Sequence, residues 1–152
     1  GTLAEGALRA PAFIHFPPAI AEGGISHSFI TVMDILPTLL EIAEAAGPGD
    51  MEIDGRDMQP LAGRSFWPLV TGQVETVHDE SSVAGWSRDP FGALIRGRYK
   101  LVNQTMPGQP VDGTPPWQLF DIVADPGETR DVAAMFPDIV EELDAIWRRD
   151  WQ

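Results

Sequence analysis

Four carboxylates, Asp121, Asp125, Glu128 and Asp131, follow one another within the segment FDIVADPGETRD. Carboxylate oxygens bind calcium, but a calcium loop of EF-hand type needs oxygens at alternating positions together with a glycine. These acids are spaced three or four residues apart and do not match that pattern. The Asp-Pro-Gly sequence is typical of a turn, in which the aspartate accepts backbone N–H bonds. We therefore favour a corner between a strand and a helix over a metal site.

The three histidines do not form a recognisable nucleophilic site. His15 lies inside the apolar run PAFIHF, His27 lies beside a predicted helix cap, and His78 lies in a polar loop. None of them has a serine and an acid at a spacing typical of a catalytic triad. We interpret His15 as a structural histidine with satisfied hydrogen bonds, and the other two as solvated.

Two basic residues, Lys100 and Arg9, are candidates for functional groups. Lys100 is the only lysine, and its place after Tyr99 on a predicted hairpin strand favours a solvated or snorkelling side chain over a catalytic base. Arg9 could anchor a carboxylate or another anion, although we favour a structural ion pair. The glycine-containing segments match neither the phosphate-binding loop nor the dinucleotide pattern. The residues alone therefore predict no catalytic, cofactor-binding or metal-binding residue in this chain.

Composition narrows the class of protein. With 152 residues, 43% of them hydrophobic, the chain can bury a core of its own. The net charge of -13 disfavours nucleic-acid binding, and the absence of cysteine excludes disulfides, cysteine zinc sites and a thiol nucleophile. No apolar run reaches the roughly 20 residues that cross a bilayer, and the start lacks a signal-peptide pattern. We expect a soluble protein, cytoplasmic or periplasmic, and the start without methionine suggests a piece of a longer chain.

The first half of the chain is predicted to contain one strand and one helix. Residues 11–16, PAFIHF, read as a buried strand that ends at two prolines. Residues 31–47, TVMDILPTLLEIAEAAG, read as a helix that Asp34 caps and Gly47 ends. Asp34 is thus predicted to be a cap and not a ligand. Residues 47–72 read as a linker with at most one short helical turn.

The second half is predicted to form an antiparallel sheet and a long helix. Alternating apolar residues and turn signals indicate four strands, at 83–86, 91–96, 98–103 and 117–121. A flexible loop at 106–116 precedes the last of them. We expect one face of the sheet, with Leu94, Tyr99 and Leu101, to be buried. The amphipathic segment PDIVEELDAIWRRDWQ is predicted to be the helix that covers it, with Phe136 packed at its start.

Five segments in this order resemble the C-terminal part of the sulfatase family, of the arylsulfatase-like kind, within the alkaline phosphatase superfamily. GTLAEGALRAP resembles the family's segment ending in EGGIRVP, with Ala7 and Ala10 as departures, and TVMDILPTLLEIA resembles its DxxPTLL helix. DGRDMQPLAGRSFWPLVTG is similar to the GxSLxPLLxG connector, and ALIRGRYKLV to the R.IRxGxWKLI hairpin. WQLFDIVADPGETRDVA resembles LYDLxxDPxExxNL, with Asp131 where asparagine is common.

The resemblance implies an α+β fold, in which a four-stranded antiparallel sheet packs on a C-terminal helix. A strand and a helix that belong to a missing α/β domain precede it. We expect residues 1–47 to be the tail end of that domain, 48–80 a connector and 81–152 the C-terminal subdomain. Glu5 and Arg9 match family positions, and we predict that both are structural.

The family's catalytic parts have no counterpart in this chain. In the family, a formylglycine made from a C/S-x-P-x-R motif cleaves sulfate esters, and aspartates with an Asn or His hold calcium. Neither that motif nor an Asp-Asp, Asp-Asn or Asp-His pair occurs here. The family's sulfate-binding lysine commonly precedes GT-x-x-EG, which would place it immediately upstream of Gly1. No catalytic, cofactor or metal residue is carried over, so calcium and formylglycine are expected only in the full-length enzyme.

The predicted function is that of a C-terminal fragment of a sulfuric ester hydrolase, inactive alone. Its expected partner is its own missing N-terminal domain, and residues 1–47 are expected to associate if that domain is absent. A phosphonate or phosphodiester hydrolase of the same superfamily is one alternative. The other is a non-catalytic carbohydrate or protein interaction module, with Trp86, Trp117 and the proline-rich loop as an aromatic platform.

Overall fold

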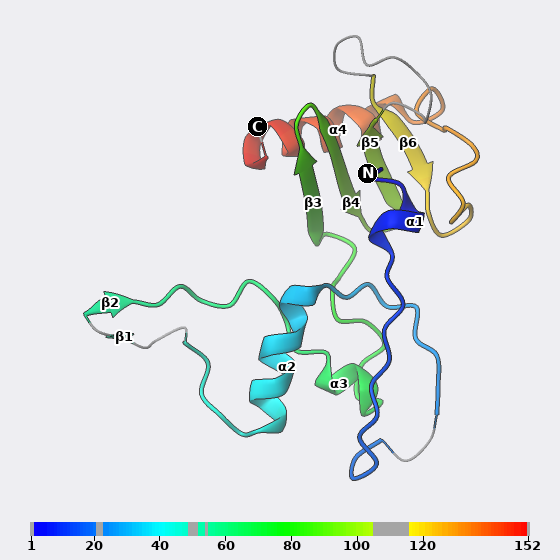
Figure 1. The fold of residues 1–152 in the computed structure, drawn as a ribbon. Coiled ribbons are helices and arrows are strands. Elements are labelled where there is room, and N and C mark those ends of the chain that lie inside the picture. Colours follow the sequence, from blue (N-terminus) through cyan, green and yellow to red (C-terminus); the bar gives the residue numbers. More distant parts are fainter. Residues whose placement is uncertain (1, 21–22, 49–51, 54, 105–115, 152) are drawn as a thin grey trace. The chain divides into compact units, whose positions relative to one another are not determined.

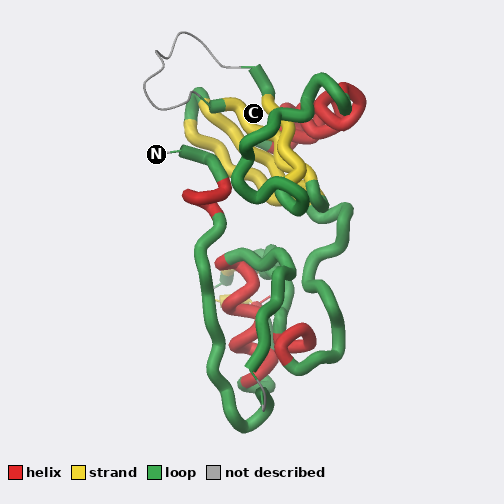
Figure 2. Tube along the Cα trace, turned by 90° about the vertical axis from the view of Figure 1, so that its right-hand side faces the viewer, coloured by secondary structure: helices red, strands yellow, loops and turns green. Residues whose placement is uncertain are grey.

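The computed structural model describes residues 2–20, 23–48, 52–53, 55–104 and 116–151. The chain forms two compact units (Figure 2). The first unit combines residues 1–12 with residues 80–152, and the second consists of residues 13–79. The structure groups the first twelve residues with the sheet, because Leu3 and Glu5 are buried against it. The assignment of residues 1–47 to the end of an α/β domain stays a prediction. The predicted loop at 106–116 lies, except for Pro116, outside the described residues.

A four-stranded antiparallel sheet forms the centre of the first unit (Figure 1). Its strands follow chain order: β3 (Val83–Arg88), β4 (Phe91–Arg96), β5 (Tyr99–Asn103) and β6 (Gln118–Asp121). Leu94 pairs with Leu101 and Leu101 with Leu119, so three leucines line up across one face. Gly97 allows the tight β4–β5 turn because its φ of 56° lies in the left-handed region. The predicted sheet is confirmed.

The C-terminal helix α4 (Pro137–Asp150) covers this leucine face. Proline at the first turn suits a helix start, since the missing N–H has no intrahelical partner there. Leu143 and Trp147 pack on the three leucines, while Tyr99 is half-buried at the edge of the same cluster. Gly92 leaves room for the Trp147 ring, because a Cβ there would lie 2.3 Å from its Cζ2 atom. The predicted packing of helix on sheet is confirmed.

The opposite face of the sheet is also covered, which the sequence did not indicate. The short helix α1 (Glu5–Leu8) and the residues before it lie on that side (Figure 1). Leu3 packs there with Ala93, Val102 and Phe120. The expectation of a single covered face was therefore wrong, because the first residues of the chain supply a second cover. This packing also decides the environment of the charged residues on that face.

The second unit contains short helices and a small hairpin. Its elements are η1 (Val32–Asp34), α2 (Ile35–Ile42), β1 (Glu52–Ile53), β2 (Arg56–Asp57) and α3 (Trp67–Val70). The predicted helix exists, but it ends at Ile42 instead of Gly47. Glu44 adopts a left-handed φ of 51°, and the Ala45 N–H donates to the Leu40 carbonyl at 2.9 Å, which terminates the helix. The short turn α3 agrees with the predicted linker.

The apolar run at 11–16 does not form a strand in this structure. A strand needs a hydrogen-bonded neighbour, and none of the described residues pairs with this run. Phe13 is 94% exposed and His15 is exposed beside it. The predicted strand was assigned to a missing α/β domain, so its burial there and the structural role of His15 stay predictions. Within the described ranges, no helix is long and apolar enough to cross a membrane.

Candidate functional site

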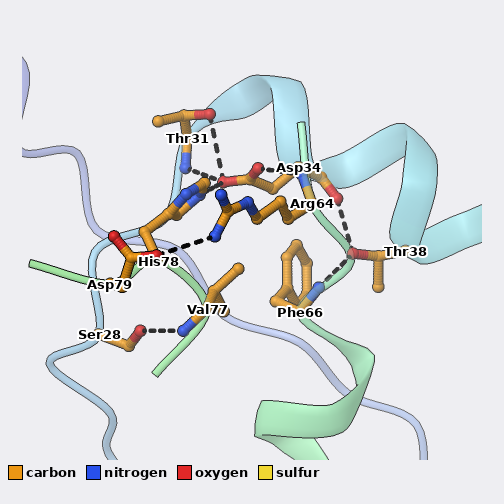
Figure 3. Close-up of polar contacts among 9 residues, drawn as sticks. All are labelled: Ser28, Thr31, Asp34, Thr38, Arg64, Phe66, Val77, His78 and Asp79. Carbon is orange, nitrogen blue, oxygen red and sulfur yellow. Dashed lines mark hydrogen bonds and ion pairs between the residues drawn. The ribbon is translucent and has the colours of Figure 1, made fainter. Parts of the chain in front are cut away.

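Asp34 is the centre of a hydrogen-bonded cluster in the second unit (Figure 3). Its side chain is fully buried. The backbone N–H of Thr31 donates to Oδ2 at 2.6 Å, and that of Arg64 donates to Oδ1 at 2.7 Å. Thr31 and Asp34 form a capping box, in which Thr31 is the N-cap of η1 and Asp34 is the third residue. The prediction that Asp34 itself caps the helix was wrong, because its side chain makes no cap bond at the start of α2. The bond from Arg64 comes from 30 residues away, and no local pattern predicts it.

His78 completes this cluster and is not solvated as predicted. Its Nε2 lies 2.9 Å from Oδ2 of Asp34, and only 14% of its side chain is exposed. Burial raises the pKa of Asp34. Hydrogen bonds from His78 and from the Arg64 and Thr31 amides, together with the charge of His78, lower the pKa by more than burial raises it. The pKa of Asp34 is therefore below its ordinary value. An ionised carboxylate only accepts hydrogen bonds, so Nε2 carries the proton.

An aspartate orients a histidine in the same way in a Ser-His-Asp catalytic triad, but the described residues of this cluster include no nucleophile hydrogen-bonded to His78. Ser28 is the serine drawn beside it, and its Oγ accepts a hydrogen bond from the Val77 N–H at 3.2 Å (Figure 3). Thr38 links the helix to the next loop, because its hydroxyl donates to the Asp34 carbonyl at 2.6 Å and accepts from the Phe66 N–H at 2.9 Å. The arrangement joins three loops to the start of α2, which is a structural role.

The second cluster is a buried group of three charges on the sheet of the first unit. Lys100 is fully buried, and its Nζ lies 3.1 Å from Oε1 of Glu5 and 2.7 Å from Oε1 of Glu128. The shorter contact lacks the direction of a hydrogen bond, so it is a charge contact. The N–H of Glu5 donates to Oε2 of Glu128 at 2.7 Å. The prediction of a solvated Lys100 was wrong, because this residue faces the side of the sheet that α1 covers.

Glu128 reaches Lys100 from an unusual backbone conformation. Its φ of 53° lies in the left-handed region, which side-chain-bearing residues seldom adopt. Such a conformation costs on the order of 1–3 kcal/mol and persists where the surroundings enforce it. The sequence analysis placed Glu128 in the corner but assigned it no partner. The only lysine of the chain, Lys100, was the signal that could have suggested one.

The other acids of the run form the predicted corner. Asp125 accepts the N–H groups of Thr129 and Arg130, each at 2.8 Å. Asp131 accepts the Leu119 N–H at 3.1 Å, which ties the corner back to β6. Asp121 accepts two N–H groups of the turn that follows it, and it forms an ion pair with Arg98, the residue before β5. These carboxylates hold the chain between the last strand and α4, so the corner prediction is confirmed.

Comparison with known proteins identifies the family. An uncharacterized sulfatase of Schizosaccharomyces pombe is 37% identical over 147 residues, which cover 97% of this chain and 26% of that protein. Mouse steryl-sulfatase is 30% identical over 158 residues, 93% of this chain and 25% of that protein. The chain belongs to the sulfatase family. The resemblance to the C-terminal part of a sulfatase is thereby confirmed.

The solved structures agree at the level of the fold, and no protein-family model matches the chain. The crystal structure of Ps i-CgsB superposes with a TM-score of 0.54 at 23% identity, covering 82% of this chain and 25% of that one. The chain spans about a quarter of the length of the curated relatives it matches.

Of the two residues in the first segment that were predicted to be structural, Glu5 and Arg9, only Glu5 is buried. Glu5 is buried and bound to Lys100, so its structural role is confirmed. Arg9 is exposed and makes no ion pair with any residue in the described ranges, contrary to the predicted pair. Trp117 donates from Nε1 to Asp144 and packs in the α4 cluster, whereas Trp86 packs on the opposite face. The two tryptophans therefore form no common platform.

Proposed function

We propose that this chain is the C-terminal part of a sulfuric ester hydrolase whose catalytic residues lie in a preceding α/β domain. The observation that carries the proposal is the match of 97% of the chain to a sulfatase at 37% identity, together with the 26% share of that relative. The chain alone is proposed to be inactive, because it lacks a C/S-x-P-x-R motif. A formylglycine nucleophile and a calcium ion are proposed for the full-length enzyme.

The acids that the structure describes do not form the proposed calcium site. Among the described residues, no three His, Asp or Glu side chains come together in a way that could hold a metal ion. Asp34, Asp125 and Asp131 use their oxygens for backbone N–H groups. We therefore assign no step of the reaction to a metal held by these residues.

The proposed partner of the second unit is the same α/β domain. Helix α2 exposes the apolar side chains of Ile35, Leu36 and Leu39, the last of them to 56%, and Phe13 is exposed in the same unit. A surface of this kind is unusual for a protein that stands alone and is typical of an interface. The relatives are about four times as long as this chain, so they contain a domain that could cover it.

The test begins with the gene upstream of Gly1. We expect a lysine codon directly before Gly1 and a C/S-x-P-x-R motif a few hundred codons earlier. The full-length protein is then assayed on p-nitrophenyl sulfate, p-nitrophenyl phosphate and a phosphonate monoester, and its motif peptide is examined by mass spectrometry for formylglycine. Hydrolysis of the sulfate ester with formylglycine present is the expected result. Preference for the phosphorus esters, or a reading frame that starts near Gly1, would refute the proposal.

Matched variants separate the two parts of the protein. Replacing the Cys or Ser of the motif by Ala should abolish sulfate-ester hydrolysis without changing the thermal unfolding temperature. Arg9→Ala should leave substrate affinity unchanged, because we assign this residue no contact with substrate. A loss of affinity in Arg9→Ala at unchanged stability would show that this chain contributes to the site.

A further inference from the structure

The sheet unit is built from two pieces of chain that are far apart in sequence, residues 1–12 and residues 80–152. The buried charges join these pieces. Glu5 comes from the first piece, and Lys100 and Glu128 come from the second. The side chains of the two glutamates are 8% and 7% exposed, so water screens the three charges little. Residues 1–12 are therefore held by charge interactions whose energy depends strongly on the distances between Lys100 and the two glutamates.

A second set of contacts holds the same piece just before Glu5. Oε1 of Gln104 accepts the Thr2 hydroxyl at 2.6 Å and the Leu3 N–H at 2.9 Å. The Leu3 side chain is buried against the sheet. Together with the bond from the Glu5 N–H to Glu128, two backbone amides of residues 2–5 are bound by side chains of the sheet piece.

These contacts fix a position more strictly than an apolar contact would. A buried ion cluster stabilises little compared with well-packed apolar residues, but its members must keep their geometry because an unpaired buried charge is unfavourable. The cluster contains two carboxylates and one ammonium group, so a shift of residues 2–5 would leave a carboxylate without its partner. Glu128 also keeps a left-handed backbone to reach this place.

We propose that Lys100 and Glu128 are positioning residues for the sulfatase reaction, because they fix residues 2–5 and thereby the place at which the preceding catalytic domain joins the sheet unit. The inference rests on the proposed function. Neither residue is assigned a contact with substrate. The chain that leads from the proposed catalytic domain into residues 2–5 would take its position from this cluster, and a displacement of about 1 Å at a catalytic group can reduce a rate by up to about 100-fold.

The first test measures amide hydrogen exchange in the full-length protein, which needs no activity. Lys100→Met and Glu128→Gln should remove the protection of the Leu3 and Glu5 amides, while the amides of β4 and β5 stay protected, to a degree reduced only by the loss of stability of the sheet unit. Arg96→Gln is the matched control, because it removes an exposed charge of the same unit that pairs with Glu142. Unchanged protection of Leu3 and Glu5 in both variants would overturn the proposal.

The second test measures steady-state kinetics on p-nitrophenyl sulfate. Glu128→Gln should lower kcat by about 10- to 100-fold and leave KM within about threefold, since a misplaced catalytic group loses stabilisation of the transition state more than ground-state binding. Arg96→Gln should have the kinetics of the wild type. Lost protection with an unchanged kcat would show that the cluster is only structural and would also overturn the proposal.

A third variant covers the case in which Lys100→Met does not fold. Gln104→Leu removes the neutral contacts to Thr2 and Leu3 and leaves the ion cluster. It should lower kcat and the protection of Leu3 together.

The failure of the proposed function is a separate outcome. A wild-type protein that does not hydrolyse the sulfate ester refutes the proposed function. In that case, the exchange of Leu3 and Glu5 still decides whether the cluster fixes the segment.

Discussion

Lys100 and Asp34 are charged residues whose side chains are fully buried, each in a different unit. Each has its charge balanced by groups from distant parts of the chain. Lys100 meets two glutamates, and Asp34 meets two backbone amides and His78. Buried charges are tolerated where partners satisfy them, and removing one partner leaves the others unfavourably buried. Substitutions at these two residues should therefore have larger effects than their small number of contacts suggests.

Lys100→Met should destabilise the sheet unit by about 3–5 kcal/mol, because it leaves two buried carboxylates without a cation. Equilibrium urea unfolding, followed by tryptophan fluorescence, measures the change. Arg96→Gln serves as the control and should change the unfolding midpoint far less, since its ion pair with Glu142 is exposed. Equal midpoints for Lys100→Met and the wild type would contradict the assigned burial of the cluster.

Asp34 should make the second unit sensitive to acid. Its pKa is lowered in the folded state, so the unfolded chain binds the proton first as the pH falls. The stabilisation is therefore complete above the ordinary value of 3.8 and is lost as the pH falls from there towards the folded pKa. His78, Arg64 and Asp79 are the titratable and charged side chains around it.

Thermal unfolding between pH 2 and pH 7 checks this dependence. Asp34→Asn should lower the unfolding temperature at neutral pH, and its difference from the wild type should shrink as the acid form of Asp34 becomes populated. Asp57→Asn, at an exposed position of β2, is the matched control and should follow the wild type. A constant difference across the whole pH range would show that the carboxylate charge does not contribute.

At the scale of elements, the fit between α4 and the sheet depends on two glycines. A Cβ on Gly92 would lie 2.3 Å from Cζ2 of Trp147, and a Cβ on Gly85 would lie 2.4 Å from Cε2 of Trp151. Trp147 is buried between Trp117 and Trp151, with ring centroids 5.7 and 6.0 Å away. Trp151 follows the end of the helix and is only half-buried. The ring against Gly92 is therefore held in the core, whereas the ring against Gly85 has room to move.

Gly92→Ala should therefore destabilise the sheet unit by about 1–3 kcal/mol, the range typical of overpacking. Gly85→Ala should have a smaller effect, because the Trp151 ring can move towards solvent. Urea unfolding of both variants, with the fluorescence of the tryptophan cluster as the signal, measures the difference. A larger loss in Gly85→Ala than in Gly92→Ala would contradict this account of the packing.

At the scale of the whole molecule, the exposed apolar side chains of the second unit predict self-association of this chain. Light scattering over a range of concentrations should show a mass that rises above that of the monomer, because apolar surface is removed from water when copies associate. Leu36→Gln with Leu39→Gln should reduce the association, and Ala45→Gln is the matched control on an exposed residue outside the helix. A monomer at all concentrations would refute this prediction.

Some of the fold is determined by the sequence through local patterns. Alternation of apolar residues and the turn at Gly97 predicted the sheet, and the apolar stripe around Leu143 predicted the helix that covers it. The turn chemistry at Asp125 predicted the corner, since a short side chain next to Pro-Gly bonds to neighbouring amides. The order of the five segments indicated the sulfatase family without any structure.

Only the tertiary structure decided what lies opposite each face and which charges meet. The burial of Lys100 depends on α1, which is about 95 residues away along the chain, and the position of His78 depends on a carboxylate 44 residues away. The failure of residues 11–16 to form a strand has the same cause, because a strand is stable only with a neighbour that the described residues do not provide. Local sequence encodes the period of an element, whereas its partners are decided by packing between residues that are distant along the chain.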